Sequence, residues 1–135
     1  TPLYSSAASD VYKRQDDRGV LAVGSTPKEI PFEVRRFFIT SATSPSVVRG
    51  QHAHKVSHQL LVAVAGSVTA TCDDGYTKTE HVLDSSNIGL YMPPLTWGQQ
   101  TSFSEGAKLL VLASELYDPE DYIESYEEFI SLVQR

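Results

Sequence analysis

Apolar residues in this chain occur in short runs separated by turn residues, a pattern typical of an all-β protein. Turn signals such as Asp73-Asp74-Gly75 and Pro93-Pro94 recur about every ten residues. Many short strands at this spacing predict a sandwich or a barrel. The predicted strands cover residues 20–23, 35–40, 52–65, 68–72, 77–83, 90–92 and 108–114.

The end of the chain has a different pattern. Asp118-Pro119-Glu120-Asp121 offers an N-cap, a proline and two acids, which together predict the start of a helix. Apolar residues then recur at helical spacing, at Tyr122, Ile123, Tyr126, Phe129, Ile130 and Val133. We therefore expect an amphipathic C-terminal helix that lies against the barrel or a partner subunit.

The length of 135 residues fits a single domain, which we assign to residues 16–135. Residues 1–15 are polar, rich in small side chains and without clear periodicity. Their run S-S-A-A-S-D-V-Y-K-R-Q resembles translated sequencing-adapter readthrough, and a disordered native leader is the alternative. We exclude this segment from the prediction of the fold as non-native or disordered.

Composition excludes several classes of partner. The formal charge of −6 and the pI of about 5.1 provide no basic field for nucleic acid. Cys72 is the single cysteine, which excludes an internal disulfide and a cysteine-built zinc site. No apolar run approaches the ~20 residues that span a bilayer. A reducing, cytoplasmic setting is the simplest interpretation.

Two histidines, His52 and His54, precede the most apolar run of the chain. Residues i and i+2 of a strand point to the same face, so both imidazoles project together. Histidine titrates near neutral pH, and the pair therefore suits either metal binding or proton transfer. The alternative without function is that the two rings satisfy each other in a polar lumen.

A metal site lacks two of its expected ligands. The spacing of His54, Gln59 and Gly66 resembles the first motif of the cupin β-barrels, with glutamine where metal-binding cupins carry glutamate. The second motif is expected at residues 89–98, where the ligand-histidine position falls on Trp97 or Gly98. His58 has the strand parity of the pair but lies farther along the chain. We predict that no metal is bound.

Arginines and aromatic residues are the candidate substrate contacts. Arg18, in the segment D-x-R-G, and Arg49 can make bidentate bonds to phosphate. A surface salt bridge is the alternative for each of them. Tyr91 and Trp97 can stack on a base or a sugar, although a position in the core explains them equally.

Several motifs together resemble one enzyme family. They are R-G-Q-H-A-H-K, L-L-V-A-V-A-G-S-V, G-L-Y-M-P-P-L-T-W, L-L-V-L-A-S-E-L-Y-D-P-E-D-Y-I and S-Y-E-E-F. This combination is similar to the sugar 3,4-ketoisomerases, which are cupin enzymes acting on dTDP-4-keto-6-deoxyglucose. The resemblance covers residues 16–129.

The resemblance implies a jelly-roll β-barrel without metal or redox cofactor, and an intimate homodimer with strands exchanged between subunits. It implies that His52 and His54 carry a proton from C3 to C4 through an enediol intermediate, in deoxy-sugar biosynthesis. It further implies that Arg18 binds the pyrophosphate and that Arg49 contacts the substrate.

The chain departs from the family pattern at two places, and these leave open which sugar is the substrate. Phe37 and Phe38 stand where family members often have tyrosine, and Gly98-Gln99 follows the tryptophan where a histidine is common. Any role of those hydroxyl or imidazole groups is therefore not carried over. A C3/C5 epimerase of the same fold, and a non-catalytic sugar-nucleotide binding module, are the alternative functions.

Overall fold

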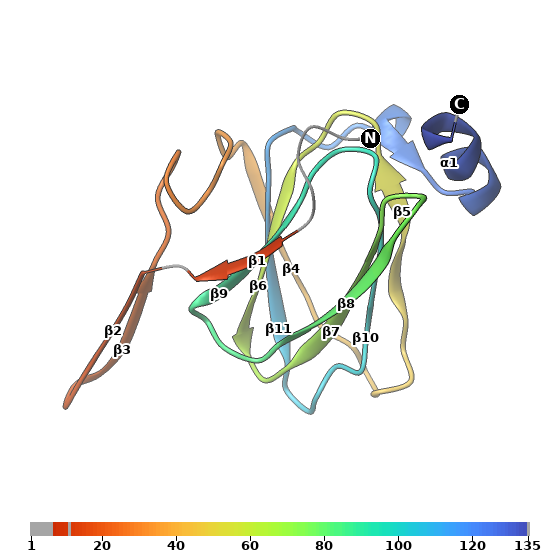
Figure 1. Cartoon of the computed structure of the whole chain (residues 1–135). Coiled ribbons are helices and arrows are strands. Elements are labelled where there is room, and N and C mark those ends of the chain that lie inside the picture. The colour runs from red at the N-terminus through yellow and green to blue at the C-terminus, as the bar shows by residue number, and fades with distance from the viewer. Residues whose placement is uncertain (1–6, 11, 135) are drawn as a thin grey trace.

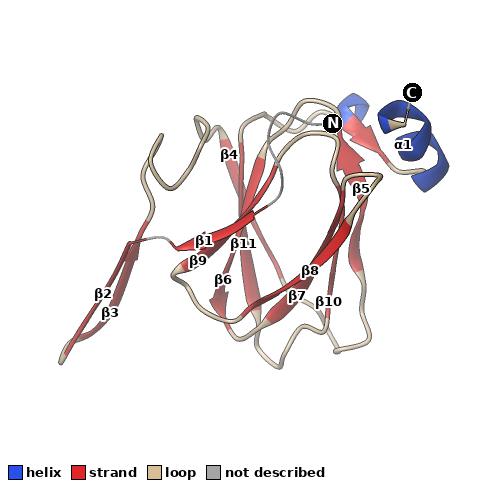
Figure 2. Cartoon of the chain, in the orientation of Figure 1, coloured by secondary structure: helices blue, strands red, loops and turns tan. Residues whose placement is uncertain are grey.

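The computed structural model describes residues 7–10 and 12–134, which form two facing five-stranded sheets and a short helix (Figures 1 and 2). The first sheet has the order β1 (Ala7–Asp10), β9 (Ile88–Met92), β6 (Gln59–Ala65), β11 (Lys108–Ala113), β4 (Arg36–Thr40). The second has the order β12 (Tyr122–Ile123), β5 (Arg49–His54), β10 (Trp97–Thr101), β7 (Val68–Asp73), β8 (Lys78–Leu83). All pairings in both sheets are antiparallel.

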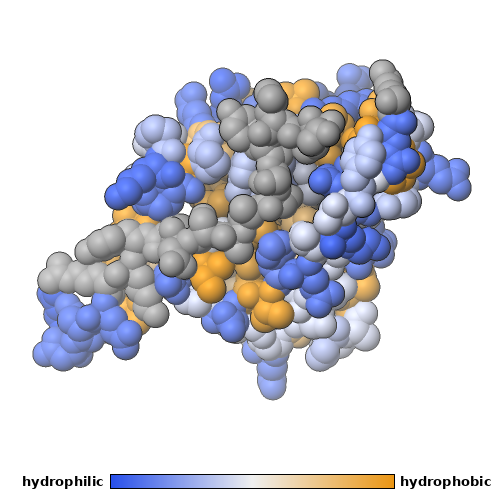
Figure 3. All heavy atoms as spheres, in the orientation of Figure 1, coloured by the Kyte–Doolittle hydropathy of each residue, from blue (hydrophilic) through white to orange (hydrophobic). Residues whose placement is uncertain are grey.

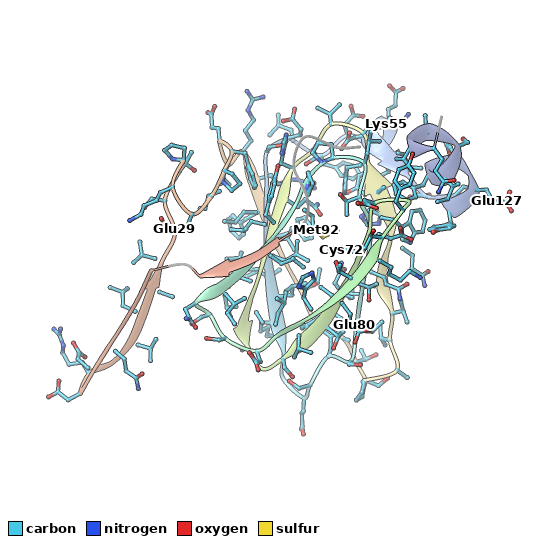
Figure 4. All side chains as sticks on the ribbon, viewed as in Figure 1. Glu29, Lys55, Cys72, Glu80, Met92 and Glu127 are labelled. Carbon is cyan, nitrogen blue, oxygen red and sulfur yellow. The ribbon has the colours of Figure 1, made fainter. Side chains whose placement is uncertain are left out.

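The mostly β architecture confirms the predicted fold class, although strand pairing among the described residues leaves the two sheets separate. Side chains from both sheets meet in one core, which includes Leu61, Val68, Cys72, Leu90, Leu109 and Val111. Figure 4 shows Cys72 and Met92 between the sheets. Burial of this apolar surface is the main stabilising contribution to the fold. No helix that the structure describes is long and apolar enough to cross a membrane.

A third, two-stranded sheet stands apart from the core. Strands β2 (Tyr12–Asp16) and β3 (Gly19–Val23) form a hairpin that projects from the sandwich (Figure 1). The hairpin tip is hydrophilic (Figure 3). Strands β1 and β2 overlap the segment 1–15, which was predicted to be non-native or disordered. That the segment is non-native stays a prediction, and residues 1–6 and 11 lie outside the described residues.

The predicted start of the helix at Asp118 is wrong. Asp118 caps a single 3-10 turn, η1 (Pro119–Asp121), and the chain then extends into β12. Helix α1 (Tyr126–Val133) begins only after a second cap, in which the Ser125 side chain accepts a hydrogen bond from the Glu128 N–H at 3.2 Å. The local pattern favours a helix here, but Tyr122 and Ile123 form a strand instead because they pair with strand β5, opposite His54 and Ala53.

Strand β10 was missed by the sequence prediction, because its residues W-G-Q-Q-T lack both an apolar run and a clean alternation. It lies between β5 and β7 in the second sheet. Helix α1 lies at one end of this sheet, beside β12 (Figure 1), where a small cluster forms around the buried residues Ala53, Ile123 and Phe129. These contacts hold the C-terminal segment against the histidine strand.

Candidate active site

Strand β5 places His52 and His54 on the face that looks into the sandwich, as the sequence predicts. Their ring centroids are 5.0 Å apart, with an interplanar angle of 86°. Both rings line one cavity between the sheets. The cavity is completed by Ser57, Gln59, Met92, Pro93, Thr96, Gly98 and Gln100.

A carboxylate orients His54. Nδ1 of His54 lies 2.9 Å from Oδ2 of Asp121, and both side chains are at least nine-tenths buried. The other carboxylate oxygen, Oδ1, accepts the N–H of Val56 at 2.7 Å, which fixes the carboxylate in place. A carboxylate only accepts, so Nδ1 carries the proton of the neutral ring and Nε2 is its basic atom. That Nε2 lies 3.3 Å from the amide nitrogen of Gln59, which lines the cavity.

The same argument applies to His52. Its Nδ1 lies 3.1 Å from the carbonyl oxygen of Gly50, which can only accept a hydrogen bond. The neutral ring therefore also has its basic atom at Nε2. Tyr122 packs against both imidazoles, with ring centroids 4.9 Å from His52 and 4.5 Å from His54. The site thus holds two adjacent rings in the tautomer that accepts a proton at Nε2.

Burial sets the protonation state of the pair. Burial lowers the pKa of His54 below its ordinary value of 6.5, and the hydrogen bond that the ring donates to Asp121 opposes this shift. Burial likewise lowers the pKa of His52, against the Gly50 carbonyl and the negative charge of Glu124. Both rings are therefore neutral near physiological pH, which is the state that a general base requires.

These shifts predict the acid limb of the pH profile. A base with a lowered pKa stays unprotonated at neutral pH, and it loses activity only when the pH falls through that lowered value. We expect kcat/KM to be highest at neutral pH and above, and to fall in acid with a midpoint below pH 6.5, the ordinary pKa of histidine. The measurement is a kcat/KM profile in buffers of constant ionic strength. A decline with its midpoint above pH 6.5 would contradict the assignment.

The cavity differs from a metal site in two respects. In the described part of the chain, no group of three or more His, Cys, Asp and Glu side chains could hold a metal ion. Gly98 faces the cavity, and a Cβ added there would lie 2.4 Å from Cε of Met92. Met92 therefore fills the space that a histidine at this position would need. The absence of a bound metal stays a prediction.

Tyr91 and Trp97 lie outside the histidine cavity. Trp97 faces helix α1, with ring centroids 5.3 Å from Tyr126 and 5.8 Å from Phe129. The hydroxyl of Tyr91 lies 2.7 Å from Nδ1 of His58 on the other outer face of the sandwich, so His58 is not a third member of the pair. Their neighbours Gly98 and Met92 take the inward positions, and strand alternation directs these two rings outward. Stacking on a substrate stays a prediction for both residues.

The predicted anion contacts also lie outside this cavity. Arg18, at the hairpin turn, pairs with Asp16 at 2.8 Å, and 79% of its side chain is exposed. The hairpin points away from β5 and the cavity (Figure 1). Nε of Arg49 donates to the carbonyl oxygen of Ser41 at 2.7 Å. Within one chain, therefore, the structure brings the two histidines together but neither arginine with them.

Asp121 and Tyr122 are the site residues that the sequence analysis missed. The acid was interpreted as part of a helix start, and 67 positions separate it from His54. No local spacing connects residues so far apart. The sequence feature that could have indicated these two residues is an acid directly before an aromatic residue, in a segment rich in tyrosine.

The fold and the site together define a cupin-type β-sandwich that holds two adjacent histidines in one cavity, one of them bonded to a carboxylate. The family model described as "WxcM-like, C-terminal" (FdtA) matches residues 5–134. The chain belongs to this family.

Named relatives agree with this membership. The chain is 40% identical over 114 residues to the TDP-4-oxo-6-deoxy-alpha-D-glucose-3,4-oxoisomerase of Aneurinibacillus thermoaerophilus, covering 84% of this chain and 82% of that enzyme. A crystal structure of a 3,4-ketoisomerase from Helicobacter canadensis has a TM-score of 0.91 and 38% identity, over 96% of this chain and 98% of that one. The sugar 3,4-ketoisomerase QdtA from Thermoanaerobacterium thermosaccharolyticum, solved with TDP, has a TM-score of 0.92 and 34% identity, over 98% of this chain and 97% of that one.

The fold extends to more distant enzymes. The rmlC epimerase of Mycobacterium tuberculosis has a TM-score of 0.77 at 15% identity, over 90% of this chain and 69% of that one. At this identity the likeness concerns the fold alone. It supports the predicted cupin-type architecture and does not distinguish one reaction from another.

Proposed function

We propose that this protein is a sugar 3,4-ketoisomerase that moves the keto group of a dTDP-linked 4-keto-6-deoxyhexose from C4 to C3. The observation that carries the proposal is the pair of adjacent histidines in one cavity, one buried and one half-buried, with both Nε2 atoms basic and with His54 oriented by Asp121. The names of the relatives support the substrate, and a variant of QdtA with one histidine replaced by asparagine was solved with TDP-4-keto-6-deoxyglucose.

The reaction needs only proton transfers. The C3 proton is acidic because C3 is next to the C4 carbonyl. A histidine Nε2 takes this proton, the C–H electron pair forms the C3–C4 double bond, and negative charge develops on the C4 oxygen. The C4 oxygen gains a proton to give the enediol, the oxygen on C3 loses its proton as the C3 carbonyl forms, and C4 receives a proton, so two protons leave the sugar and two return. The electron count of the sugar is unchanged, so no redox cofactor takes part.

Proton exchange tests the proposal directly. The protein is incubated in deuterated water with dTDP-4-keto-6-deoxyglucose, and the sugar ring is followed by NMR. An isomerase gives the 3-keto sugar with deuterium at C4. An epimerase would introduce deuterium at C3 or C5 and leave the keto group at C4, whereas a binding module would give no exchange. Either of these outcomes would overturn the proposed reaction.

We also propose that two copies form a homodimer in the cytoplasm. The outer face of the first sheet exposes Phe37 (65%), Ile39 (55%) and Val64 (46%), and the projecting hairpin exposes Val20 and Leu21. So much clustered apolar surface is typical of a protein interface. An exchange of hairpins between subunits would carry Arg18 away from its own chain and toward the cavity of the other copy.

The interface is tested by a charge on strand β4. A carboxylate buried against a second copy is strongly unfavourable, so we expect Phe37→Glu to shift the protein from dimer to monomer. The measurement is the molar mass by light scattering after size-exclusion chromatography. Val82→Glu is the matched control, because Val82 is similarly exposed (59%) but lies on the second sheet. A Phe37→Glu protein that remains dimeric would place the interface elsewhere.

The role of Arg18 has a separate test. Arginine binds a diphosphate through charge-assisted hydrogen bonds, and we expect Arg18→Ala to raise the KM of the nucleotide sugar by about tenfold or more. The value of kcat should change much less, since the diphosphate is remote from the reacting carbons. Lys28→Ala, in an exposed loop, is the control. An unchanged KM would leave Arg18 as a partner of Asp16 only.

A further inference from the structure

Arg36 is an arginine on the inner face of the sandwich. Residues of strand β4 alternate, with Phe37 and Ile39 exposed on the outside and Phe38 packed against the core between the sheets. Arg36 shares the parity of Phe38 and therefore points inward. Its neighbour Arg35 precedes the strand and is exposed.

The sheet register places Arg36 beside the histidine cavity. Arg36 is paired with Ala113 of β11, and Ala113 is paired with Gln59 of β6. These three residues form one row across the sheet, in which Arg36 and Gln59 lie about 10 Å apart at the backbone. Ala113, fully buried between them, has only a methyl group. A long side chain at position 36 can therefore extend toward Gln59, which contacts Nε2 of His54.

The charge of Arg36 is not neutralised within the described chain. The ion pairs there are Arg18–Asp16 and His54–Asp121, and neither involves Arg36. Its Nε is buried without a hydrogen-bond partner among these residues. Two aromatic rings hold the guanidinium, with its Cζ 5.2 Å from the ring centroid of Phe38 and 5.7 Å from that of Tyr117. Such contacts fix the group in place but satisfy no N–H donor.

The positive charge of Arg36 affects His54, one of the two histidines in the cavity. Burial is the main reason that the pKa of His54 is lowered, and the positive charge of Arg36 lowers it further. Tyr117, beneath the guanidinium, also packs against Tyr122 with ring centroids 5.8 Å apart. Tyr122 in turn contacts both histidines. A cation with no ion pair among the described residues thus lies close enough to His54, which lines the cavity, to act on its charge.

We propose that Arg36 binds substrate and that its guanidinium stabilises the negative oxygen that develops on the hexose when C3 is deprotonated. The inference rests on the proposed isomerase function. A fixed cation in a partly buried site stabilises such an oxyanion far more than it stabilises the neutral ketone. Its contribution should therefore be found in kcat rather than in the binding of the nucleotide. This distinguishes Arg36 from the predicted diphosphate contact Arg18.

Four variants test the inference. Arg36→Gln and Arg36→Met remove the charge, and methionine also keeps an apolar stem against the aromatic rings. Arg36→Lys keeps the positive charge but loses the planar arrangement of N–H donors of the guanidinium group. Arg35→Gln is the matched control, with the same chemical change on the adjacent exposed residue. The readouts are kcat and KM, the Kd of TDP by calorimetry, circular dichroism, and the His54 pKa by NMR titration.

We expect Arg36→Gln and Arg36→Met to lower kcat by about 10²-fold or more, with the Kd of TDP and the circular dichroism spectrum unchanged. Arg36→Lys should recover part of the rate, and Arg35→Gln should match the wild type. The His54 pKa should rise when the charge at position 36 is removed. Wild-type kcat in both neutral variants overturns the inference, and so does weaker TDP binding with normal kcat, which would assign Arg36 to the diphosphate. A wild-type protein that does not isomerise the sugar overturns the proposed function as well.

Discussion

Replacing His52 or His54 by asparagine is expected to lower kcat by about 10²-fold or more. Asparagine is polar and can still donate toward Asp121 or Gly50, but its amide has no basic nitrogen. The Nε2 atoms of the two rings carry no proton of their own in this tautomer and are the groups that can accept one in the cavity. A single base can carry the proton between neighbouring carbons while its companion orients the carbonyl, so the two variants need not be equally slow.

The control for this prediction is His81→Asn. His81 lies on strand β8 and interacts with Thr79 at the surface, away from the cavity, so its replacement should leave kcat unchanged. Calorimetric binding of TDP and the thermal unfolding temperature show whether each variant still folds and binds. Near-normal turnover in both His52→Asn and His54→Asn would mean that the histidines only fill the space between the sheets.

The second large effect is expected for Asp121→Asn, with a fall in kcat of about 10²-fold. The amide oxygen can still accept the N–H of Val56, which turns the NH₂ group toward Nδ1 of His54. Nδ1 must then accept, and the proton of the neutral ring moves to Nε2. The imidazole keeps its place but loses its basic atom in the cavity. The kinetic change should therefore occur without a large loss of stability.

NMR of nitrogen-15-labelled histidine separates this explanation from simple misfolding. We expect the neutral His54 ring to change from the Nδ1–H to the Nε2–H tautomer in Asp121→Asn. Glu120→Gln, on the adjacent exposed residue, should retain both the wild-type tautomer and the wild-type rate. An unchanged tautomer together with an unchanged kcat would show that Asp121 only anchors the turn at Val56.

The sheet core and the histidine pair were predictable because both depend on local patterns. Period-two alternation and turn residues located most strands, and the i, i+2 spacing placed His52 and His54 on one face. The run at residues 60–63 is buried on both faces, as its unbroken apolar character indicates. Strand β10 could not be found in this way, since its glutamines occupy strand positions that apolar residues usually take.

The rest of the site depends on contacts between distant segments. The order of strands brings Asp121 to His54, and it brings Arg36 into the same row as Gln59. Neither juxtaposition has a short-range signature. Arg18 and Arg49 stand in recognisable sequence motifs, whereas Arg36 has no such motif and is distinguished only by its position on the inner face of the sheet. The tertiary structure, and not the local sequence, shows which polar side chains face the cavity.

The distance along the chain between His54 and Asp121 has a consequence during translation. The ribosome makes the histidine 67 residues before the acid. A nascent chain that has been synthesised through Val111 already contains every buried residue of the largest core cluster, but it lacks the carboxylate that sets the histidine tautomer. If Asp121 has the role proposed for it, the C-terminal segment must be made and docked on β5 before the protein can turn over substrate. Chains cut short before this point, by a premature stop or a protease, are then expected to be inactive even with an intact core.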